Sequence, residues 1–199
     1  MLIVFARHGE TEYNCEGRLQ GISDSPLTKK GIEQAKKLAK LAKTINVIQI
    51  FSSPATRCIE TTKVIAKESN IPVTIINNLK EMCYGSWEGH KKSLLKADNL
   101  WQTRNKDKYN FVHPGEYEGL AGESYAIIYP RVANFLKKLI KGNKKDVILV
   151  ISHLGVMRNT KRYFENCSEP EIIAYNPSNE EVYAVLINPK DHTSKIVTI

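Results

Sequence analysis

The fold of this chain follows from one stretch near its start, LIVFARHGET at residues 2–11. Its first five residues are apolar without interruption, which predicts a strand buried on both faces. The run then ends in two basic side chains, Arg7 and His8, and Gly9 lets another group approach the backbone closely. The stretch therefore predicts an anion site, built around a reactive imidazole, at the tip of a buried strand.

A second segment repeats this order of apolar run, polar tip and helical stretch. The run VIQIF at residues 47–51 ends in a pair of serines. Ser53 suits the N-cap of a helix and Pro54 suits its first turn, which predicts a helix over residues 56–68. The segment therefore predicts a second buried strand that leads directly into a helix.

A third segment has the same order near the end of the chain. The run VILVI at residues 147–151 ends in Ser152 and His153. Helical spacing follows through Arg158 and Phe164. This segment predicts a third buried strand with a histidine at its tip.

Apolar strands that alternate with helices predict the fold class. They are typical of an α/β protein, here a three-layer α/β/α sandwich with a mostly parallel central sheet and helices on both faces. Ligands of such sheets bind outside the carboxyl ends of the strands, so Arg7, His8, Arg57 and His153 should meet at one edge. No repeat or linker divides the chain, and we expect a single domain over residues 1–199.

Further elements complete this prediction. Pro130 lies inside one helical pattern and should cause a kink or begin a new helix. The predicted elements are a helix over 28–43, a strand over 72–76, a helix over 93–104, a surface excursion over 105–122, a helix over 122–139, and a hairpin of strands 182–187 and 196–199.

Composition narrows the functional classes. The 199 residues are 42% hydrophobic and 25% charged, as in an ordinary globular protein. No apolar run approaches the roughly 20 residues that cross a bilayer, and Arg7 and His8 interrupt the first run too early for a signal peptide. We therefore expect a soluble, cytoplasmic protein with no membrane partner.

The net charge of +8 raises the alternative of a nucleic-acid binder. Many of the lysines, such as Lys36 and Lys40, lie opposite apolar residues at helical spacing, as on a solvated helix face. A concentrated basic stripe with interleaved aromatic residues is absent from the sequence. We expect no nucleic-acid partner.

The residue types indicate metal-free phosphate chemistry. The four cysteines have no C-x-x-C spacing, and the sequence has neither a P-loop motif nor an obvious acidic metal cage. We therefore expect reduced thiols, no metal and no cofactor. Arginines and helix amides, including those of Ser53 and Leu154, would then neutralise a phosphoryl group, and a neutral histidine would be the nucleophile.

These residues belong to a longer ordered set of motifs that resembles the histidine phosphatase superfamily, which includes cofactor-dependent phosphoglycerate mutases and small-molecule phosphatases. The resemblance covers nearly the whole chain. The motifs are RHGET at 7–11 with Asn14, GRLQG at 17–21, PLT at 26–28, GIEQA at 31–35, SSP at 52–54 with Arg57 and Thr61, Glu81 with Gly85 and WEG at 87–89, GES at 122–124, and Ser152 with His153.

The resemblance implies a role for each matching residue. His8 would be the nucleophile that becomes phosphorylated. Arg7, Arg57 and His153 would hold the phosphoryl oxygens with help from Asn14. Glu81 would be the general acid that protonates the leaving alkoxide and then takes a proton from the attacking water. Each residue also has a plainer interpretation: His8 as a core histidine, Arg57 as an ion-pair partner of Glu60, and Glu81 as a surface carboxylate.

The substrate pocket is less well defined by sequence. Its expected walls lie next to the motif positions and comprise Gln20, Gly21, Tyr84, Leu154 and the segment 113–122. Three positions depart from the family pattern. Leu154 replaces a common glycine, Cys58 replaces a common alanine and should expose a thiol to oxidation, and Tyr84 stands where phosphoserine phosphatases of the family have histidine. Trp87 should be a packing residue, and the remaining histidines, His90, His113 and His192, should be exposed.

These observations favour a metal-independent phosphomonoester hydrolase that acts on a small phosphorylated metabolite, with phosphoserine first and bisphosphorylated sugars behind. The interval between Glu81 and His153 is compact and polar, whereas mutases of this family carry a longer basic insertion there. A cofactor-dependent phosphoglycerate mutase is the alternative, and a non-catalytic sensor of phosphorylated ligands is a more distant one. A homodimer remains open as the assembly.

Overall fold

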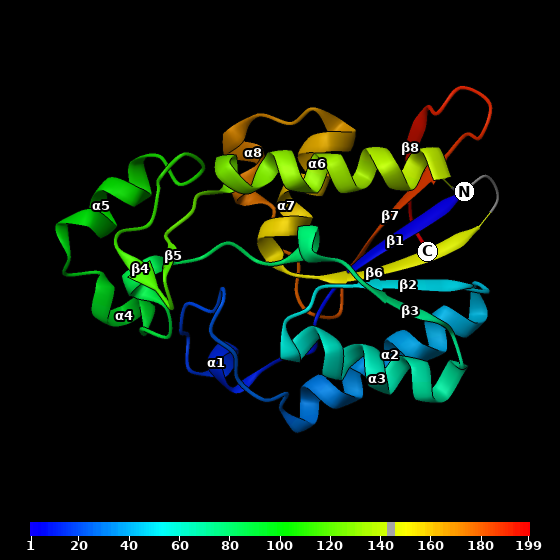
Figure 1. The fold of residues 1–199 in the computed structure, drawn as a ribbon, viewed down its shortest axis with the longest axis horizontal. Coiled ribbons are helices and arrows are strands. Elements are labelled where there is room, and N and C mark those ends of the chain that lie inside the picture. The colour runs from blue at the N-terminus through cyan, green and yellow to red at the C-terminus, as the bar shows by residue number, and fades with distance from the viewer. Residues whose placement is uncertain (143–145) are drawn as a thin grey trace.

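The computed structural model describes residues 1–142 and 146–199. Its main sheet has the strand order β3-β2-β6-β1-β7-β8 (Figure 1). The first four strands in this order are mutually parallel. Strand β7 is antiparallel to β1, and β8 is antiparallel to β7. The strands are β1 (Leu2–Arg7), β2 (Gln49–Ser52), β3 (Val73–Ile75), β6 (Val147–Ser152), β7 (Val182–Ile187) and β8 (Ser194–Val197). The predicted mostly parallel sheet and the terminal hairpin are confirmed.

Helices cover both faces of this sheet (Figure 1). One layer holds α2 (Lys29–Thr44) and α3 (Thr56–Ser69), and the other holds α6 (Tyr125–Gly142), α7 (Leu154–Glu165) and α8 (Glu169–Ala174). Side chains of β1 alternate between the layers: Ile3 packs in the cluster that includes residues of α6 and α7, and Val4 packs in the cluster that includes residues of α2. The predicted three-layer sandwich is confirmed.

Short elements form a lobe beyond the carboxyl ends of the parallel strands (Figure 1). Its core is aromatic and includes the buried Trp87, Trp101 and Tyr109. The elements outside the two helical layers are α1 (Glu12–Cys15), the 3-10 turns η1 (Asn77–Leu79) and η2 (Gly85–Trp87), α4 (Lys92–Leu95), α5 (Asn99–Lys106), β4 (Glu116–Tyr117) and β5 (Leu120–Ala121).

Two predicted helices differ in the structure. The helix expected over 93–104 is split into α4 and α5, because Asp98 caps a new helix by accepting the amide of Leu100 at 2.8 Å. By contrast, α6 runs through Pro130 as one helix, so the expectation of a new helix there is wrong. Ile128 and Val132 are fully buried on either side of the proline, and this packing compensates for the missing hydrogen bond.

The predicted cap of α3 is also wrong. The N-cap residue is Ala55, and α3 begins at Thr56. The amide of Ser53 donates to the carbonyl of Ile151 at 3.0 Å and so extends the pairing of β2 with β6. This amide is therefore engaged in the sheet and is not free to bind phosphate.

The segment 105–122 is only in part the surface excursion that was expected. It carries the β4–β5 hairpin, but Tyr109 and His113 are 3% and 2% exposed. His113 is buried, against expectation, because its Nδ1 donates to the carbonyl of Glu123 at 2.7 Å and its ring meets the edge of Tyr84. His90 and His192 are exposed as predicted.

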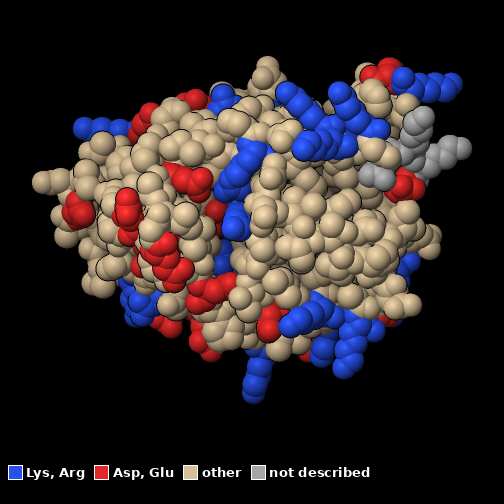
Figure 2. All heavy atoms as spheres, in the orientation of Figure 1, with Lys and Arg blue, Asp and Glu red and all other residues tan. Residues whose placement is uncertain are grey.

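Charged side chains are distributed around the surface. Figure 2 shows one face, on which Lys and Arg lie mostly at the margins of a broad uncharged area and Asp and Glu gather over the small lobe. In the ranges 1–142 and 146–199, no helix combines the length and apolarity needed to cross a membrane.

Candidate active site

Two strand tips bring two histidines together. Arg7 and Ser152 are register partners at the ends of β1 and β6, and the amide of His8 donates to the carbonyl of Ser152 at 3.0 Å. The rings of His8 and His153 follow these tips, with centroids 5.4 Å apart. The two side chains are 4% and 1% exposed. The predicted convergence of strand tips is present.

The backbone selects one tautomer of His8. Its Nδ1 lies 2.8 Å from the carbonyl oxygen of Gly9, which can only accept a hydrogen bond. Nδ1 therefore carries the proton, and the lone pair of a neutral ring is on Nε2. The amide of Gly9 donates to Oγ1 of Thr61 at 2.9 Å and so fixes the turn that carries the ring. This arrangement leaves Nε2 as the ring nitrogen that carries a lone pair.

The surroundings favour neutral imidazoles. Burial lowers the pKa of His8 well below its ordinary value of 6.5, and the charges of Arg57 and Arg7 lower it further. The pKa of His153 is lowered well below 6.5 by burial, Arg57 and His8, in that order. A neutral ring is the reactive form of a histidine nucleophile, so the same groups that would attract a phosphate also favour the form of His8 that such a role requires.

Arg57 is held by a set of fixed acceptors. It lies in the first turn of α3 and is 1% exposed. Nη1 donates to the carbonyl of Ser23 at 3.0 Å and to the carboxylate of Asp24 at 3.1 Å. Nη2 donates to the carbonyl of Gly21 at 2.8 Å and to Nδ1 of His153 at 3.0 Å. Its buried Nε has no hydrogen-bond partner in the described part of the chain, and this N–H remains a donor for an anion.

Arg57 in turn fixes the tautomer of His153. Since a guanidinium can only donate, Nδ1 of His153 accepts and Nε2 carries the proton. Nε2 then donates to Oγ of Ser53 at 2.8 Å. Both ring nitrogens are therefore occupied by protein partners.

Arg7 supplies a second donor at the strand tip. Its Nη1 donates to the carbonyl of Pro177 at 3.0 Å. Its buried Nε, like that of Arg57, has no partner among the residues described. Arg7, which precedes His8, and Arg57, which contacts His153, therefore each keep one buried N–H without a protein partner among the described residues.

Hydrogen bonds fix Glu81 both at its carboxylate and at its backbone carbonyl. Its carboxylate accepts the amide of Gly155 at 2.9 Å and the amide of Met82 at 3.0 Å, and the side chain is 5% exposed. A Cβ on Gly155 would lie 2.2 Å from Oε1 of Glu81, so any larger residue there would displace the carboxylate. Arg131 of α6 donates to the carbonyl of Glu81 at 3.1 Å and to that of Lys80 at 2.6 Å. Sequence reasoning missed the positioning roles of Gly155 and Arg131, since neither belongs to a motif used above.

Glu88 organises the loop that holds Arg57. It is 6% exposed, and its carboxylate accepts the amides of Gly21 at 3.0 Å, Ile22 at 2.9 Å, Ser23 at 3.2 Å and Tyr84 at 2.9 Å. The carbonyls of Gly21 and Ser23 are the ones that receive Arg57. Glu88 was part of the quoted WEG motif but received no role, because its partners are backbone amides that sequence does not reveal.

The predicted pocket residues differ in availability. Asn14 completes the capping box of α1, because its Oδ1 accepts the amide of the N-cap residue Thr11 at 3.2 Å. The side-chain amide of Gln20 is hydrogen-bonded at both ends, to Thr11 and to Ser25. Gly21 is buried and lines the cavity beside Glu81. The further predicted pocket residues are Tyr84, which is 9% exposed, and Leu154, the half-buried first residue of α7.

Cys58 does not expose a thiol, against expectation. The residue is fully buried, and its Sγ lies 3.5 Å from Nε2 of His153. Burial raises the pKa of this thiol to about 12, so the reactive thiolate is disfavoured. Cys58 lies on the buried face of α3, in the cluster that packs against the sheet. An exposed thiol would require a position on the opposite face of the helix.

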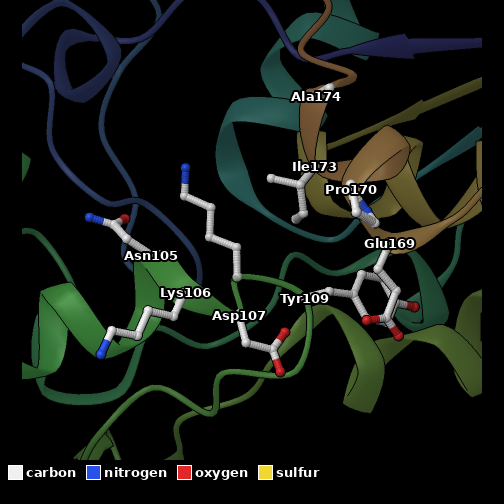
Figure 3. A pocket seen from close by; sticks show the side chains of 9 residues that line it. Asn105, Lys106, Asp107, Tyr109, Glu169, Pro170, Ile173 and Ala174 are labelled. Carbon is white, nitrogen blue, oxygen red and sulfur yellow. The ribbon is translucent and has the colours of Figure 1, made fainter.

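Two cavities can be compared with the residues of the candidate site. One of about 310 Å³ is lined by Glu81, Gly21, Lys80 and neighbouring loop residues. Another of about 760 Å³ lies between the end of α5 and α8, as Figure 3 shows. Of the two, the smaller cavity is the one that a candidate catalytic residue, Glu81, lines.

The geometry combines a neutral histidine, arginine donors and a buried carboxylate at the carboxyl ends of parallel strands. A family model, the histidine phosphatase superfamily (branch 1), matches residues 3–198. The chain belongs to the histidine phosphatase superfamily. The resemblance drawn from the sequence motifs is confirmed.

Relatives of this histidine phosphatase have several names. It is 32% identical over 159 residues to phosphoserine phosphatase 1 of Hydrogenobacter thermophilus, covering 78% of this chain and 72% of the relative. It is 32% identical over 162 residues to a Salmonella choleraesuis protein named probable phosphoglycerate mutase GpmB, covering 79% and 73%. The crystal structure of the α-ribazole phosphatase from Shigella flexneri matches with a TM-score of 0.83 at 25% identity, covering 100% of this chain and 96% of that one. The family and these relatives support a phosphatase activity.

Proposed function

We propose that this histidine phosphatase hydrolyses a small phosphomonoester, phosphoserine being the first candidate, through a phosphohistidine at His8. The observation that carries the proposal is the hydrogen bond from Nδ1 of His8 to the carbonyl of Gly9 at 2.8 Å, which leaves a lone pair on Nε2 of a buried, neutral ring. The proposal is further supported by the similarity to phosphoserine phosphatase 1.

In the first step, Nε2 of His8 attacks phosphorus and the bond from phosphorus to the ester oxygen breaks. The N–H groups of Arg7 and Arg57 stabilise the charge on the phosphoryl oxygens, so the protein's own cations supply the electrostatic catalysis. A protonated Glu81 donates its proton to the leaving alkoxide, which departs as an alcohol.

In the second step, water attacks the phosphohistidine. The carboxylate of Glu81 takes a proton from this water, the bond from Nε2 to phosphorus breaks, and phosphate leaves. Both steps use the same groups in the same positions, and His8 returns to its neutral form. His153 holds Arg57 through Nδ1 and is the second imidazole beside the phosphoryl group.

A phosphate-release screen tests this proposal. It should contain phosphoserine, 3-phosphoglycerate and sugar phosphates, each with EDTA, and compare the wild type with His8→Ala. We expect EDTA-resistant release that the substitution reduces by about 10³-fold or more, as for loss of a catalytic nucleophile. Full activity in the variant would reject His8, isomerisation of 3-phosphoglycerate faster than its hydrolysis would establish the mutase alternative, and binding without turnover would indicate a sensor.

A further inference from the structure

The loop that precedes β7 lies against the tip of β1. Strand β7 is antiparallel to β1, and its first residue, Val182, is the register partner of Ala6. Because β7 begins where β1 ends, the residues just before Val182 lie beside those just after Ala6. The residues after Ala6 are Arg7 and His8, and the catalytic steps above make no use of the loop at 176–181. The topology therefore brings a segment without an assigned role to the candidate nucleophile.

This loop contacts two consecutive residues of the strand tip. The carbonyl of Pro177 accepts Nη1 of Arg7 at 3.0 Å. Asn179 donates through Nδ2 to the carbonyl of His8 at 2.6 Å. The first contact involves a side chain of the tip, whereas the second involves the backbone of His8 itself. Asn179 is therefore the residue of this loop that acts directly on His8.

Hydrogen bonds within the loop hold its shape. The amide of Ser178 donates to Oε1 of Glu181 at 2.9 Å, and the amide of Glu180 donates to Oγ of Ser178 at 3.3 Å. Asn179 lies between these residues and is half-buried. A donor on a loop of fixed shape restrains its acceptor, so Asn179 can hold the carbonyl of His8 at a fixed position.

The peptide group between His8 and Gly9 is held at both ends. Its carbonyl accepts Nδ2 of Asn179, and its N–H donates to Oγ1 of Thr61 at 2.9 Å. Thr61 is 1% exposed on α3, and its hydroxyl donates to the carbonyl of Arg57 at 2.7 Å, so the oxygen is fixed as the acceptor for this N–H. Because a peptide group is planar, hydrogen bonds at its two opposite ends fix its rotation.

The acceptor for the His8 ring depends on this rotation. The carbonyl of Gly9 follows directly after the held peptide group, and it accepts Nδ1 of His8 at 2.8 Å. Gly9 has no side chain to restrict its backbone, and a Cβ there would lie 2.4 Å from the carbonyl oxygen of Gly31, so a larger residue would clash with that backbone. The hydrogen bonds of Asn179 and Thr61 therefore supply a restraint that a side chain at position 9 cannot.

We infer that Asn179 is a positioning residue for His8. It holds the carbonyl of His8, with Thr61 at the other end of the peptide group, and so keeps the carbonyl of Gly9 directed at Nδ1 of the ring. The proton then stays on Nδ1 and the lone pair stays on Nε2. The inference rests on the proposed function and deepens it, because it names a residue on which the orientation of the nucleophile depends. Asn179 acts through the backbone and is assigned no contact with the substrate.

Nitrogen chemical shifts of His8 test the inference without a substrate. Protonated and unprotonated ring nitrogens of a neutral histidine differ in shift, so long-range proton–nitrogen spectra of ¹⁵N-histidine-labelled protein near neutral pH report the tautomer. The chain has five histidines, and the signals missing from His8→Ala are those of His8. We expect the Nδ1–H form in the wild type and an about tenfold larger share of the Nε2–H form in Asn179→Ala. The signals of His113, whose Nδ1 is held by Glu123, should not change.

Kinetics on the ester that the wild type hydrolyses fastest gives a second readout. Asn179→Ala should lower kcat by about tenfold to hundredfold, because the ring is less precisely oriented for attack, and should change KM by less than about twofold. Asn179→Asp has nearly the same shape but its carboxylate cannot donate, so it should lose at least as much activity. The matched control is Asn176→Ala, at an exposed position of the same loop, which should keep the kcat and the His8 shifts of the wild type.

A second variant changes the same peptide group at its other end. Thr61→Val keeps the branched shape of the side chain but leaves the amide of Gly9 without its acceptor. The His8 shifts should therefore move in the same direction as in Asn179→Ala. Unfolding temperatures of all variants identify any loss of the fold, which would also change the signals of the other buried histidines.

Wild-type nitrogen shifts of His8 in both Asn179→Ala and Thr61→Val would overturn the inference. A lower kcat in Asn179→Ala with an unchanged tautomer of His8 would overturn it as well, since the residue would then have a structural role only. Failure of the proposed function is seen separately, as activity that persists in His8→Ala or as the absence of hydrolysis of every ester in the screen.

Discussion

The reactivity proposed for His8 depends on three features of its immediate surroundings. The carbonyl of Gly9 holds the proton on Nδ1, burial disfavours the charged ring, and Arg57 and Arg7 add positive charge nearby. Each feature lowers the pKa or fixes the tautomer, so the lone pair of Nε2 is present over a wide range of pH. A histidine exposed on the surface, such as His192, has none of them.

The general-acid role proposed for Glu81 can be tested directly. Glu81→Gln cannot protonate a leaving group, so kcat/KM for phosphoserine should fall by about 10²- to 10⁴-fold. An aryl phosphate with an acidic phenol needs little protonation and should lose much less. Steady-state kinetics with both substrates checks this, with the exposed Glu118→Gln as control. An equal loss on both substrates would contradict a general-acid role.

Individual residues also show where prediction from sequence ends. The positions of Arg7, His8, Arg57 and His153 follow from apolar strands whose tips must meet at one edge of a sheet. The inward turn of Cys58 and the engagement of both ends of Gln20 depend on side-chain packing that no strand or helix pattern specifies. Such contacts become visible only when distant segments are placed together.

Elements of the small lobe hold those residues in place. Glu88 directly follows the turn η2, and its carboxylate accepts amides of the loop at residues 21–23. That loop supplies carbonyls to Arg57 on α3. The arginine is thus positioned by an element that contributes no catalytic group. Similarly, α6 positions Glu81 through Arg131.

The loop held by Glu88 should therefore be sensitive to one substitution. Glu88→Gln removes a buried charge that accepts several hydrogen bonds, and it should lower the free energy of unfolding by about 2–4 kcal/mol. Because Arg57 loses its support, kcat/KM should also fall by about tenfold or more. Glu16→Gln, at an exposed ion pair with Arg18, should cost less than about 1 kcal/mol and leave activity unchanged. Chemical denaturation and kinetics measure both effects, and equal behaviour of the two variants would contradict a positioning role for Glu88.

Sequence predicted the long elements better than the short ones. Hydrophobic periodicity located β1, β6 and α2 closely, since their pattern repeats over many residues. Periodicity failed where a single residue determines whether a helix ends or continues. Asp98 divides α4 from α5 by capping a new helix, and Pro130 does not end α6. There, a single side-chain hydrogen bond or tertiary packing outweighs the periodic signal.

Across the whole molecule, buried neutral histidines link stability to pH. His8, His113 and His153 are at most 4% exposed, and the pKa of each is lowered by burial. Below pH 6.5 the unfolded chain binds protons at these positions and the folded chain does not. Stability is therefore complete above about pH 6.5 and declines as the pH falls toward the folded-state pKa values.

The size of this dependence of stability on pH can be calculated for His113, because burial lowers its pKa from 6.5 to about 4. Its contribution to the fall in unfolding free energy between pH 7 and pH 5 is about 2 kcal/mol. In His113→Gln this fall should be smaller by that amount, and in the exposed His192→Gln it should match the wild type. Urea denaturation at both pH values makes the comparison, and identical pH slopes in all three proteins would be inconsistent with a buried neutral His113.

The whole account depends on a covalent bond between phosphorus and His8, and trapping that bond tests it most directly. Enzyme mixed with ³²P-phosphoserine, or with another phosphoester that the screen shows to be hydrolysed, is quenched in base within one turnover and mapped by mass spectrometry. We predict a base-stable, acid-labile phosphoryl group on the peptide that contains His8, and no such label in His8→Ala. Turnover without any trapped phosphoenzyme, or a label on a different residue, would contradict the account.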